Sequence, residues 1–378
     1  MHEHLYHTAR IDSAGSPTLF SMTEPFAALY LAAGVTTIRT AGAIDVQADL
    51  DLARAIDAGE VPGPRVHVTG PYLEGPGGLA EMPPLEDGDA VSAVVDRWAL
   101  RGASSFKAYT HLGREELAAA VASAHRHGAT ITGHLCAVGF GEAVELGIDN
   151  IEHGFATNTD FIPDKADDEC PAAAFSGLSH VEPGDSATTA TIAMLIERDV
   201  AITSTLAVFE QYVPGRPAVA RRVLDLLTGA SRESCLAQRR ALEAGAFGDF
   251  EPLFRKEMVL EKMFVDAGGT LLVGADPTGN GCVVAGYGTQ RSIELLVEAG
   301  FPPIEAIRIA SRNGAEFLDV EDRLGTIEPG KLADLVVVLG DPTVQIADIE
   351  SVEMVFKEGR AFDPAELVAS AMGKVGIP

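Results

Sequence analysis

Short runs of β-branched and apolar residues alternate with longer stretches of helical period up to about residue 320. Such runs predict strands, and the stretches between them predict helices. The predicted strands are 35–39, 65–69, 105–109, 129–134, 150–153, 200–206 and 270–274, with residues 2–4 as the end of an eighth. The predicted helices are 24–33, 48–58, 89–101, 115–127, 140–146, 187–198, about 218–268, 290–299 and 303–318. Strict alternation is typical of a parallel α/β sheet, and eight units predict a (β/α)8 TIM-type barrel.

The pattern changes after residue 318. A turn-rich segment at 324–331 precedes a predicted buried strand at 333–339 and a second strand at 352–356. A closed barrel leaves no free edge for further strands, so these belong to a separate β element. We therefore expect a barrel at 1–320, and a small β-sandwich element with a C-terminal tail at 321–378. Residues 160–185, with three prolines and several acids, are predicted to form a solvated loop or lid.

Acidic residues outnumber basic ones, 55 against 28, which gives a net charge of −27. Such a surface repels phosphate backbones and anionic lipids, so the expected partner is a small molecule, not nucleic acid or a membrane. The four cysteines, at 136, 170, 235 and 282, contain no C-x-x-C pair. This spacing argues against a zinc ribbon and against a disulfide scaffold, and Cys136 is expected to be a small buried apolar residue.

Polar residues of metal-ligand type stand at the predicted carboxyl ends of the strands. In a barrel those ends face one pocket. The six are His2, His4, Lys107, His134, His153 and Asp276. His2 and His4 are two apart, and on a strand both imidazoles point the same way. Taken singly, each histidine is more often a satisfied core residue, and Asp276 is equally well read as a helix cap.

Lys107 lies within an apolar strand, where an unpaired ammonium is costly. A lowered pKa leaves a neutral amine to which carbon dioxide can add, and the resulting carbamate can bridge two cations. The alternative is a lysine paired with a nearby carboxylate. Six suitable residues on five strand ends form a joint pattern that few other folds produce.

In these six residues the chain resembles the amidohydrolase superfamily. Supporting stretches are Gly34–Arg39, Ile151–Gly154 and Gly325–Leu335, and the likeness covers nearly the whole chain. It is most similar to the imidazolonepropionase-like and metal-dependent dipeptidase branch, whose lysine is carboxylated. The resemblance implies that His2, His4 and Asp276 hold one ion and that His134 and His153 hold a second, with carboxylated Lys107 bridging them.

The same resemblance implies the chemistry. A hydroxide shared by two divalent ions, zinc before manganese, cobalt or iron, would attack the carbonyl. Asp276 would act as the catalytic base and then as the acid. The dipeptidase branch often has a tyrosine three residues after the sixth-strand histidine, where this chain has Ala156. Arg39, Tyr109 and Tyr287 are therefore the candidate substrate-binding residues.

A second departure concerns the start of the chain. Family members place a strand and part of a β-sandwich before the H-x-H motif, whereas here Met1 directly precedes His2. We expect that the N-terminal half of the sandwich is missing because the chain starts late. The sequence therefore does not determine the cellular compartment: the default expectation is the cytoplasm, and a late start is also compatible with export. The sequence is compatible with a homo-oligomer as well.

These observations predict a metal-dependent hydrolase of a C–N bond in an amide, peptide, N-acyl amino acid or cyclic amide. One alternative is a mononuclear deaminase, although such enzymes usually lack the ligating lysine. Another is a non-catalytic homologue that binds small molecules. No G-x-S-x-G motif or P-loop is present, so serine hydrolysis and nucleotide binding have no support.

Overall fold

Six parallel strands form the centre of the computed structural model, which describes residues 1–10, 17–78, 82–216, 219–246 and 250–377. Their order in the sheet is their order in the chain: β5 (Thr69–Leu73), β6 (Ser105–Ala108), β7 (Thr130–Gly133), β8 (Asn150–Glu152), β9 (Ala201–Ser204) and β10 (Leu271–Val273). A second parallel pair joins β3 (Thr37–Arg39) to β4 (Arg65–His67). Each predicted strand from 35–39 onward is confirmed, and the strand predicted at 65–69 is interrupted at Val68 before β5 begins.

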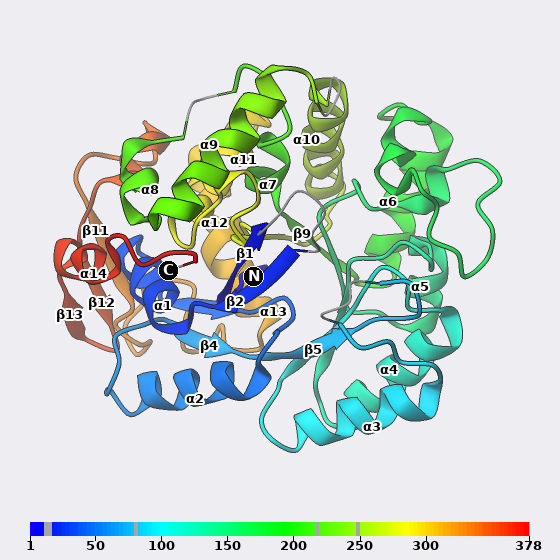
Figure 1. The fold of residues 1–378 in the computed structure, drawn as a ribbon, viewed down its shortest axis with the longest axis horizontal. Helices are drawn as coiled ribbons and strands as arrows, with labels where there is room; N and C mark the ends of the chain where they lie inside the picture. The colour runs from blue at the N-terminus through cyan, green and yellow to red at the C-terminus, as the bar shows by residue number, and fades with distance from the viewer. Residues whose placement is uncertain (11–16, 79–81, 217–218, 247–249, 378) are drawn as a thin grey trace.

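The helices lie around the outside of these strands (Figure 1). Those close to their predicted bounds are α1 (Thr23–Ala32), α2 (Val46–Asp57), α3 (Gly88–Ala99), α4 (Arg114–Arg126), α5 (Phe140–Leu146), α6 (Ser186–Glu197) and α11 (Tyr287–Glu298). Aspartates at 45, 87 and 185 cap α2, α3 and α6 by accepting a backbone N–H three residues on. These caps explain why the starts of the three helices were readable in the sequence.

Two long predicted helices are divided in the structure. In place of 218–268 there are α8 (Arg221–Leu226), α9 (Gly229–Glu243) and α10 (Glu251–Asp266), with residues 218 and 247–249 outside the described part. In place of 303–318 there are α12 (Pro303–Arg308), a π-helical turn and α13 (Gly314–Phe317). The short helix α7 (Leu206–Glu210) was not predicted, because its apolar residues continue the pattern of β9.

The N-terminal segment is hydrogen-bonded on both sides. The backbone N–H groups of Ala275 and Asp276 donate to the His2 carbonyl at 3.1 Å, beyond the end of β10. On the other side, the N–H of Ala41 donates to the Glu3 carbonyl at 2.9 Å, beyond the end of β3. A hairpin of β1 (Tyr6–Arg10) and β2 (Pro17–Ser21) follows and was not predicted. These bonds hold the H-x-H motif between the first and last parallel strands.

The C-terminal element is an antiparallel sheet of β11 (Leu335–Val338), β12 (Val352–Lys357) and β13 (Arg360–Phe362). It is followed by α14 (Pro364–Ala371), which was not predicted and which packs with β12 against α1. The prediction of a buried strand at 333–339 is wrong, since Val336 and Val337 are 41% and 43% exposed. An apolar run indicates a strand but does not say whether both of its faces are covered. The boundary at residue 320 stays a prediction.

All four cysteines form disulfides, Cys136–Cys170 and Cys235–Cys282. The expectation of no disulfide framework, and of Cys136 as a plain apolar residue, is therefore wrong. The partners are 34 and 47 residues apart in sequence, yet folding brings their Cα atoms to 4.9 and 5.3 Å. Sequence spacing detects only local pairs, so these could not be found from it.

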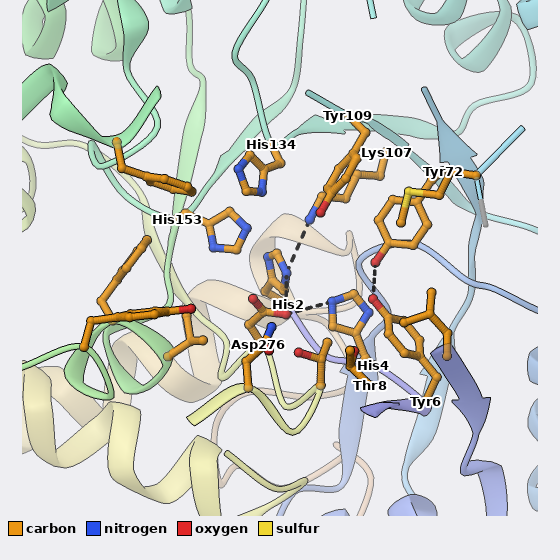
Figure 2. Close-up of a pocket in the computed structure, with 18 of the residues that line it drawn as sticks. His2, His4, Tyr6, Thr8, Tyr72, Lys107, Tyr109, His134, His153 and Asp276 are labelled. Atoms are coloured by element: carbon orange, nitrogen blue, oxygen red, sulfur yellow. Dashed lines mark hydrogen bonds and ion pairs between the residues drawn. The ribbon is translucent and has the colours of Figure 1, made fainter. Parts of the chain in front are cut away.

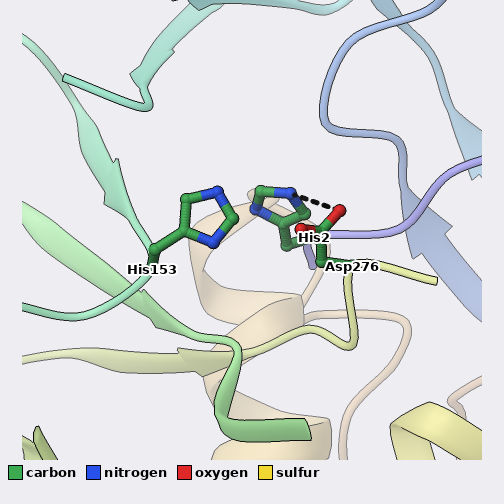
Figure 3. Close-up of side chains that lie close together, drawn as sticks. All are labelled: His2, His153 and Asp276. Carbon is green, nitrogen blue, oxygen red and sulfur yellow. Dashed lines mark ion pairs between the residues drawn. The ribbon is translucent and has the colours of Figure 1, made fainter. Parts of the chain in front are cut away.

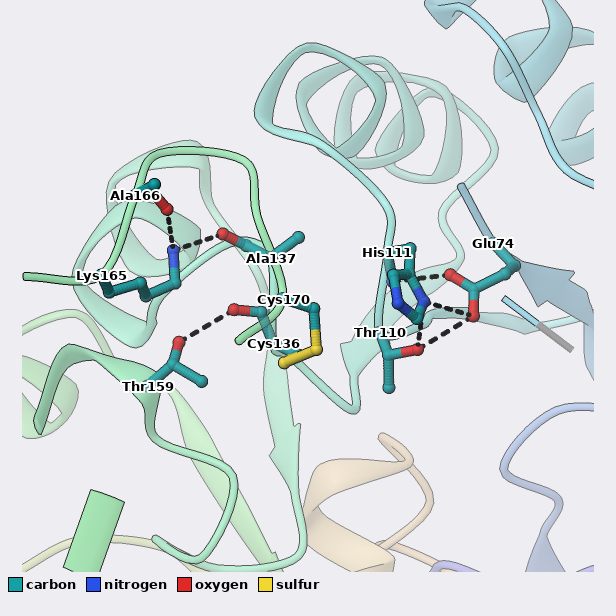
Figure 4. Close-up of a disulfide and its surroundings, with 9 residues drawn as sticks. All are labelled: Glu74, Thr110, His111, Cys136, Ala137, Thr159, Lys165, Ala166 and Cys170. Atoms are coloured by element: carbon teal, nitrogen blue, oxygen red, sulfur yellow. Dashed lines mark hydrogen bonds and ion pairs between the residues drawn. A yellow bond between two sulfur atoms is a disulfide. The ribbon is translucent and has the colours of Figure 1, made fainter. Parts of the chain in front are cut away.

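The first disulfide fixes the segment predicted to be a loop or lid, which contains two 3₁₀ turns, η1 (Thr159–Phe161) and η2 (Ala174–Ser179). Figure 4 shows Cys170 of this segment joined to Cys136, two residues after His134. Lys165 also donates to the Ala137 carbonyl at 2.6 Å, and Thr159 donates to the Cys136 carbonyl at 2.9 Å. The segment is thus attached to the loop that follows β7.

We expect removal of the second disulfide, by Cys235→Ser with Cys282→Ser, to lower the free energy of unfolding by about 2–4 kcal/mol, because a closed loop restricts the unfolded chain. Denaturant unfolding of the oxidised proteins measures this. A thiol assay on unreduced, unfolded wild-type protein should find no free thiol. Four free thiols, or equal stability of the variant, would contradict the pairing.

A second prediction concerns Glu257 and Glu261, which are four residues apart on α10 and are both buried. The N–H of Phe155, just beyond β8, donates to Glu257 at 2.8 Å. Burial raises the pKa of Glu257 from 4.5 to about 8 and raises that of Glu261 as well. Between pH 4.5 and about pH 8 the folded protein keeps protons on these carboxyl groups that the unfolded chain has released. The free energy of unfolding therefore falls as the pH rises. Thermal unfolding from pH 5 to 9 should show this fall, weakened in Glu261→Gln but not in the exposed control Glu353→Gln. An unchanged slope in Glu261→Gln would refute the assignment.

Candidate metal centre and active site

The six residues that the sequence singles out as ligands meet at one cavity of 430 Å³. Lys107 lies within β6, His134 and His153 directly follow β7 and β8, and Asp276 lies just beyond β10. His2 and His4 lie in the N-terminal segment. Figure 2 shows their side chains directed toward a common centre from different strands: His2, His4, Lys107, His134, His153 and Asp276. The convergence at the carboxyl ends of the strands is the arrangement that an α/β sheet uses for active sites.

The ligand atoms are close enough to share ions. Potential ligand atoms of His2, His153 and Asp276 all lie within 4.8 Å of one another (Figure 3). Nε2 of His4 is 3.0 Å from a carboxylate oxygen of Asp276, and Nζ of Lys107 is 3.3 Å from Nε2 of His2. The ring centres of His134 and His153 are 4.5 Å apart. The resemblance assigns His2 and Asp276 to one ion and His153 to the other. Because these three residues lie so close together, the two expected metal positions are adjacent.

Two of these residues have an unusual backbone. His153 and Asp276 have φ of 68° and 51°, in the left-handed region that non-glycine residues seldom adopt. Such a conformation costs on the order of 1–3 kcal/mol and persists only where the surrounding structure enforces it. Here it turns the chain sharply at the ends of β8 and β10, which brings both side chains over the strand ends.

Three imidazoles are oriented by a partner on the nitrogen that faces away from the cavity. Nδ1 of His2 is 2.7 Å from a carboxylate oxygen of Glu152, and Nδ1 of His153 is 2.9 Å from the Thr205 hydroxyl. Nδ1 of His4 is 3.3 Å from the Gly42 carbonyl. Metal-binding histidines usually have such outer partners, which fix the tautomer and leave Nε2 free as a ligand.

Arg39 does not line the cavity. It is fully buried behind the site, where it donates to Glu152 at 2.5 Å, to Asn150 at 2.9 Å and to the Met1 carbonyl at 2.8 Å. Thr132 also donates to Glu152, at 2.6 Å. Because Arg39 serves to neutralise a buried carboxylate, we do not carry it forward as a substrate contact. Sequence reasoning missed Glu152, which directly precedes His153.

The protonation states suit metal binding. Burial lowers the pKa of Lys107 to about 8 and those of His4 and His134 to about 4 and about 3, so the imidazoles are neutral near pH 7. Burial opposes ionisation of Asp276, but hydrogen bonds with His2 and His4 hold its pKa well below the usual value. His4 and His134 therefore offer neutral nitrogen and Asp276 offers anionic oxygen, donors that fit a divalent cation.

The two candidate tyrosines take different positions. Tyr109 lines the cavity, whereas Tyr287 lies outside its lining and packs against the guanidinium of Arg222 at 4.5 Å. The substrate-binding role of Tyr109 stays a prediction. Three tyrosines that the sequence did not single out, Tyr6, Tyr72 and Tyr212, also line the cavity, and Tyr6 and Tyr72 share a hydroxyl–hydroxyl hydrogen bond of 2.6 Å. Tyr6 is two residues after His4, and in an extended segment residues two apart point the same way. The alternation that places His2 and His4 on one side therefore could have indicated that Tyr6 faces the cavity.

None of the helices in the described part of the chain combines the length and apolarity needed to cross a bilayer.

The amidohydrolase family profile matches residues 1–362. The chain therefore belongs to the amidohydrolase family, and it is an enzyme that acts on carbon–nitrogen bonds. None of the curated proteins matches the sequence.

Solved structures share the fold at low identity. A proposed prolidase from Bifidobacterium longum is 24% identical with a TM-score of 0.63, and the match covers 92% of this chain and 79% of that one. An Xaa-Pro dipeptidase solved with methionine in its active site is 22% identical, with a TM-score of 0.61 over 89% and 77%. Bottromycin amidohydrolase is 21% identical, with a TM-score of 0.71 over 92% and 77%.

The contact between Glu152 and His2 leads to a prediction. In Glu152→Gln the amide oxygen can still accept from Arg39, but the amide N–H would donate to Nδ1 of His2 and leave the imidazole proton on Nε2. We expect zinc affinity to fall by about 10- to 100-fold, the usual effect of losing an outer partner. Calorimetric zinc titration measures this, with the exposed Glu353→Gln as control. Equal affinities in variant and wild type would contradict the orienting role.

Proposed function

We propose that the protein is a binuclear metal hydrolase that cleaves the C–N bond of a small amide, peptide, N-acyl amino acid or cyclic amide. One observation carries this: four imidazoles, one amine and one carboxylate, remote in sequence, face a single cavity, and three of the imidazoles have their outer nitrogen occupied. Structural histidines need no such common orientation. The prolidase, dipeptidase and amidohydrolase similarities point to the same bond type.

The ligands would divide between the two ions as the family resemblance implies. His2, His4 and Asp276 would hold one ion, His134 and His153 the other, and a carbamate on Lys107 would join them. The buried Lys107 amine, with its lowered pKa, is suited to adding carbon dioxide. Zinc matches the nitrogen and oxygen donors best. We propose in addition that the ring of parallel strands closes into a barrel through the hydrogen-bonded segment that carries His2 and His4.

When bound, the cations would lower the pKa of a water molecule to roughly 7 and polarise the scissile carbonyl. The remaining steps fall to the protein. Asp276, held ionised beside His2 and His4, would accept the proton of the attacking water and deliver it to the leaving nitrogen. Tyr109, in the cavity wall, is positioned to contact the substrate.

Metal content tests the proposal and separates it from its alternatives. We expect two zinc ions per chain and a carbamate resonance by ¹³C NMR after equilibration with labelled bicarbonate. Lys107→Met should lose that resonance and at least one of the ions. One ion per chain in the wild type would favour a mononuclear deaminase, and a metal-free chain without hydrolytic activity would favour a non-catalytic binding protein.

Turnover tests the role of Asp276. In Asp276→Asn we expect a folded protein whose kcat is lowered by about 100- to 10,000-fold, because the amide cannot carry the proton. The assay is hydrolysis of the best substrate from a panel of N-acyl amino acids and amides, with the exposed Asp322→Asn as control. Near-normal turnover would rule out Asp276 as the proton carrier.

A further inference from the structure

One side of the cavity is formed by aromatic rings from three separate segments. Phe175 comes from η2, Phe209 from α7, Tyr212 follows α7, and Phe250 directly precedes α10. We call these four residues the aromatic wall. Phe209 and Phe250 are stacked at 6.1 Å, Phe175 meets Phe209 edge-on at 6.4 Å, and Tyr212 meets Phe250 at 5.8 Å. The rings thus make one continuous apolar surface.

The aromatic wall begins at the proposed metal ligands. The ring of Phe175 is 5.9 Å from that of His134, and the ring of Phe209 is 6.0 Å from that of His153. A substrate whose carbonyl lies at the strand ends would therefore place its neighbouring substituent against these rings. The wall is also held in place, because Cys136–Cys170 and the bonds from Lys256 to the Leu178 and Val181 carbonyls attach the segment that carries Phe175.

Apart from Lys107, the described lining residues of the cavity offer no cationic side chain to a charged substituent. Among its described lining residues the only cationic side chain is Lys107 and the only carboxylate is Asp276, both assigned to the metal centre. The other polar groups are neutral: Thr8, Thr278, Asn280 and the tyrosine hydroxyls. The guanidinium groups of Arg216 and Arg291 behind α7 are both paired with Glu210.

A carboxylate on the substrate would therefore lose its hydration without gaining a cationic partner, unless it bound at the metal centre itself. The net charge of −27 opposes its approach as well. An aromatic group, by contrast, gains both apolar burial and edge-to-face contacts. A cavity of 430 Å³ has room for one ring beside the scissile bond.

We propose that this enzyme acts on uncharged amides or carbamates that carry an aryl group next to the scissile carbonyl, and that Phe175, Phe209 and Phe250 determine this specificity. The proposal rests on the proposed metal-dependent hydrolysis and narrows its substrate class. It separates this chain from enzymes that recognise a free α-carboxylate by a cationic side chain.

Hydroxamates test the substituent preference of the cavity without requiring turnover. Their chelating group binds zinc, and their substituent then contacts the aromatic wall. Calorimetry on the zinc-loaded protein would compare acetohydroxamate, benzohydroxamate, and benzohydroxamates with a 4-carboxylate or an isosteric 4-carboxamide. We expect benzohydroxamate to bind about 30-fold more tightly than acetohydroxamate, the factor that burying one ring gives. The 4-carboxylate should bind at least about 10-fold more weakly than the 4-carboxamide, since it has no cationic partner.

Phe175→Ala is the variant of choice, because this side chain is 46% exposed and its removal spares the core. It should reduce the preference for benzohydroxamate about fivefold or more, and leave acetohydroxamate binding unchanged. Ile304→Ala, which removes an apolar side chain 61% exposed on α12, should change neither affinity.

The outcomes separate this proposal from the one on which it rests. Zinc-loaded protein that binds acetohydroxamate as tightly as benzohydroxamate, or that prefers the 4-carboxylate, would overturn the substrate class and leave the metal centre standing. Zinc-loaded protein that binds none of the probes would contradict an accessible zinc ion in this cavity as well. A protein that takes up no zinc at all would overturn the proposed function itself.

Discussion

The carboxylate of Glu152 is the interaction on which the site depends. It is completely buried at the end of β8 and accepts hydrogen bonds from Arg39 on β3, from Thr132 on β7 and from His2 in the N-terminal segment. A buried carboxylate is tolerated only if it is paired and hydrogen-bonded. Burial opposes its ionisation, yet Arg39, His2 and Lys107 hold its pKa well below the usual value. One charge thereby joins two neighbouring strands of the six-stranded sheet, β7 and β8, to β3 of the second parallel pair and to the N-terminal segment.

This arrangement explains why residues of the N-terminal segment can serve as ligands. His2 is held through its side chain by Glu152 and through its carbonyl by the N–H groups of Ala275 and Asp276. The backbone bonds bring Asp276, in its left-handed conformation, next to both His2 and His4. The positions of the Asp276 carboxylate and of the His2 and His4 imidazoles are therefore coupled. A substitution at Glu152, behind the site, would shift His2 and with it the other proposed ligands.

The other side of the cavity is built by different means. The proposed metal ligands lie at strand ends or in the N-terminal segment, whereas the aromatic wall comes from η2, from α7 and the residues just after it, and from the start of α10. Loops tolerate sequence change more readily than strands, so this side can set the substrate while the strand ends keep the chemistry. The disulfide between Cys136 and Cys170 links the two sides, since it ties the segment of Phe175 to the loop that follows His134.

The sequence by itself determined the alternation of strands and helices, the parallel sheet and the six residues of the cavity centre, because these depend on local periodicity and on position at strand ends. Tyr109 was named from the sequence as a candidate substrate contact, and it lines the cavity. The sequence could not show that Arg39 faces inward to Glu152 while Tyr287 lies outside the cavity, since strand position does not reveal the partner. It also could not show the two disulfides, the exposure of β11, or the aromatic wall. These arise only when segments tens to hundreds of residues apart come into contact, and no local pattern records such contacts.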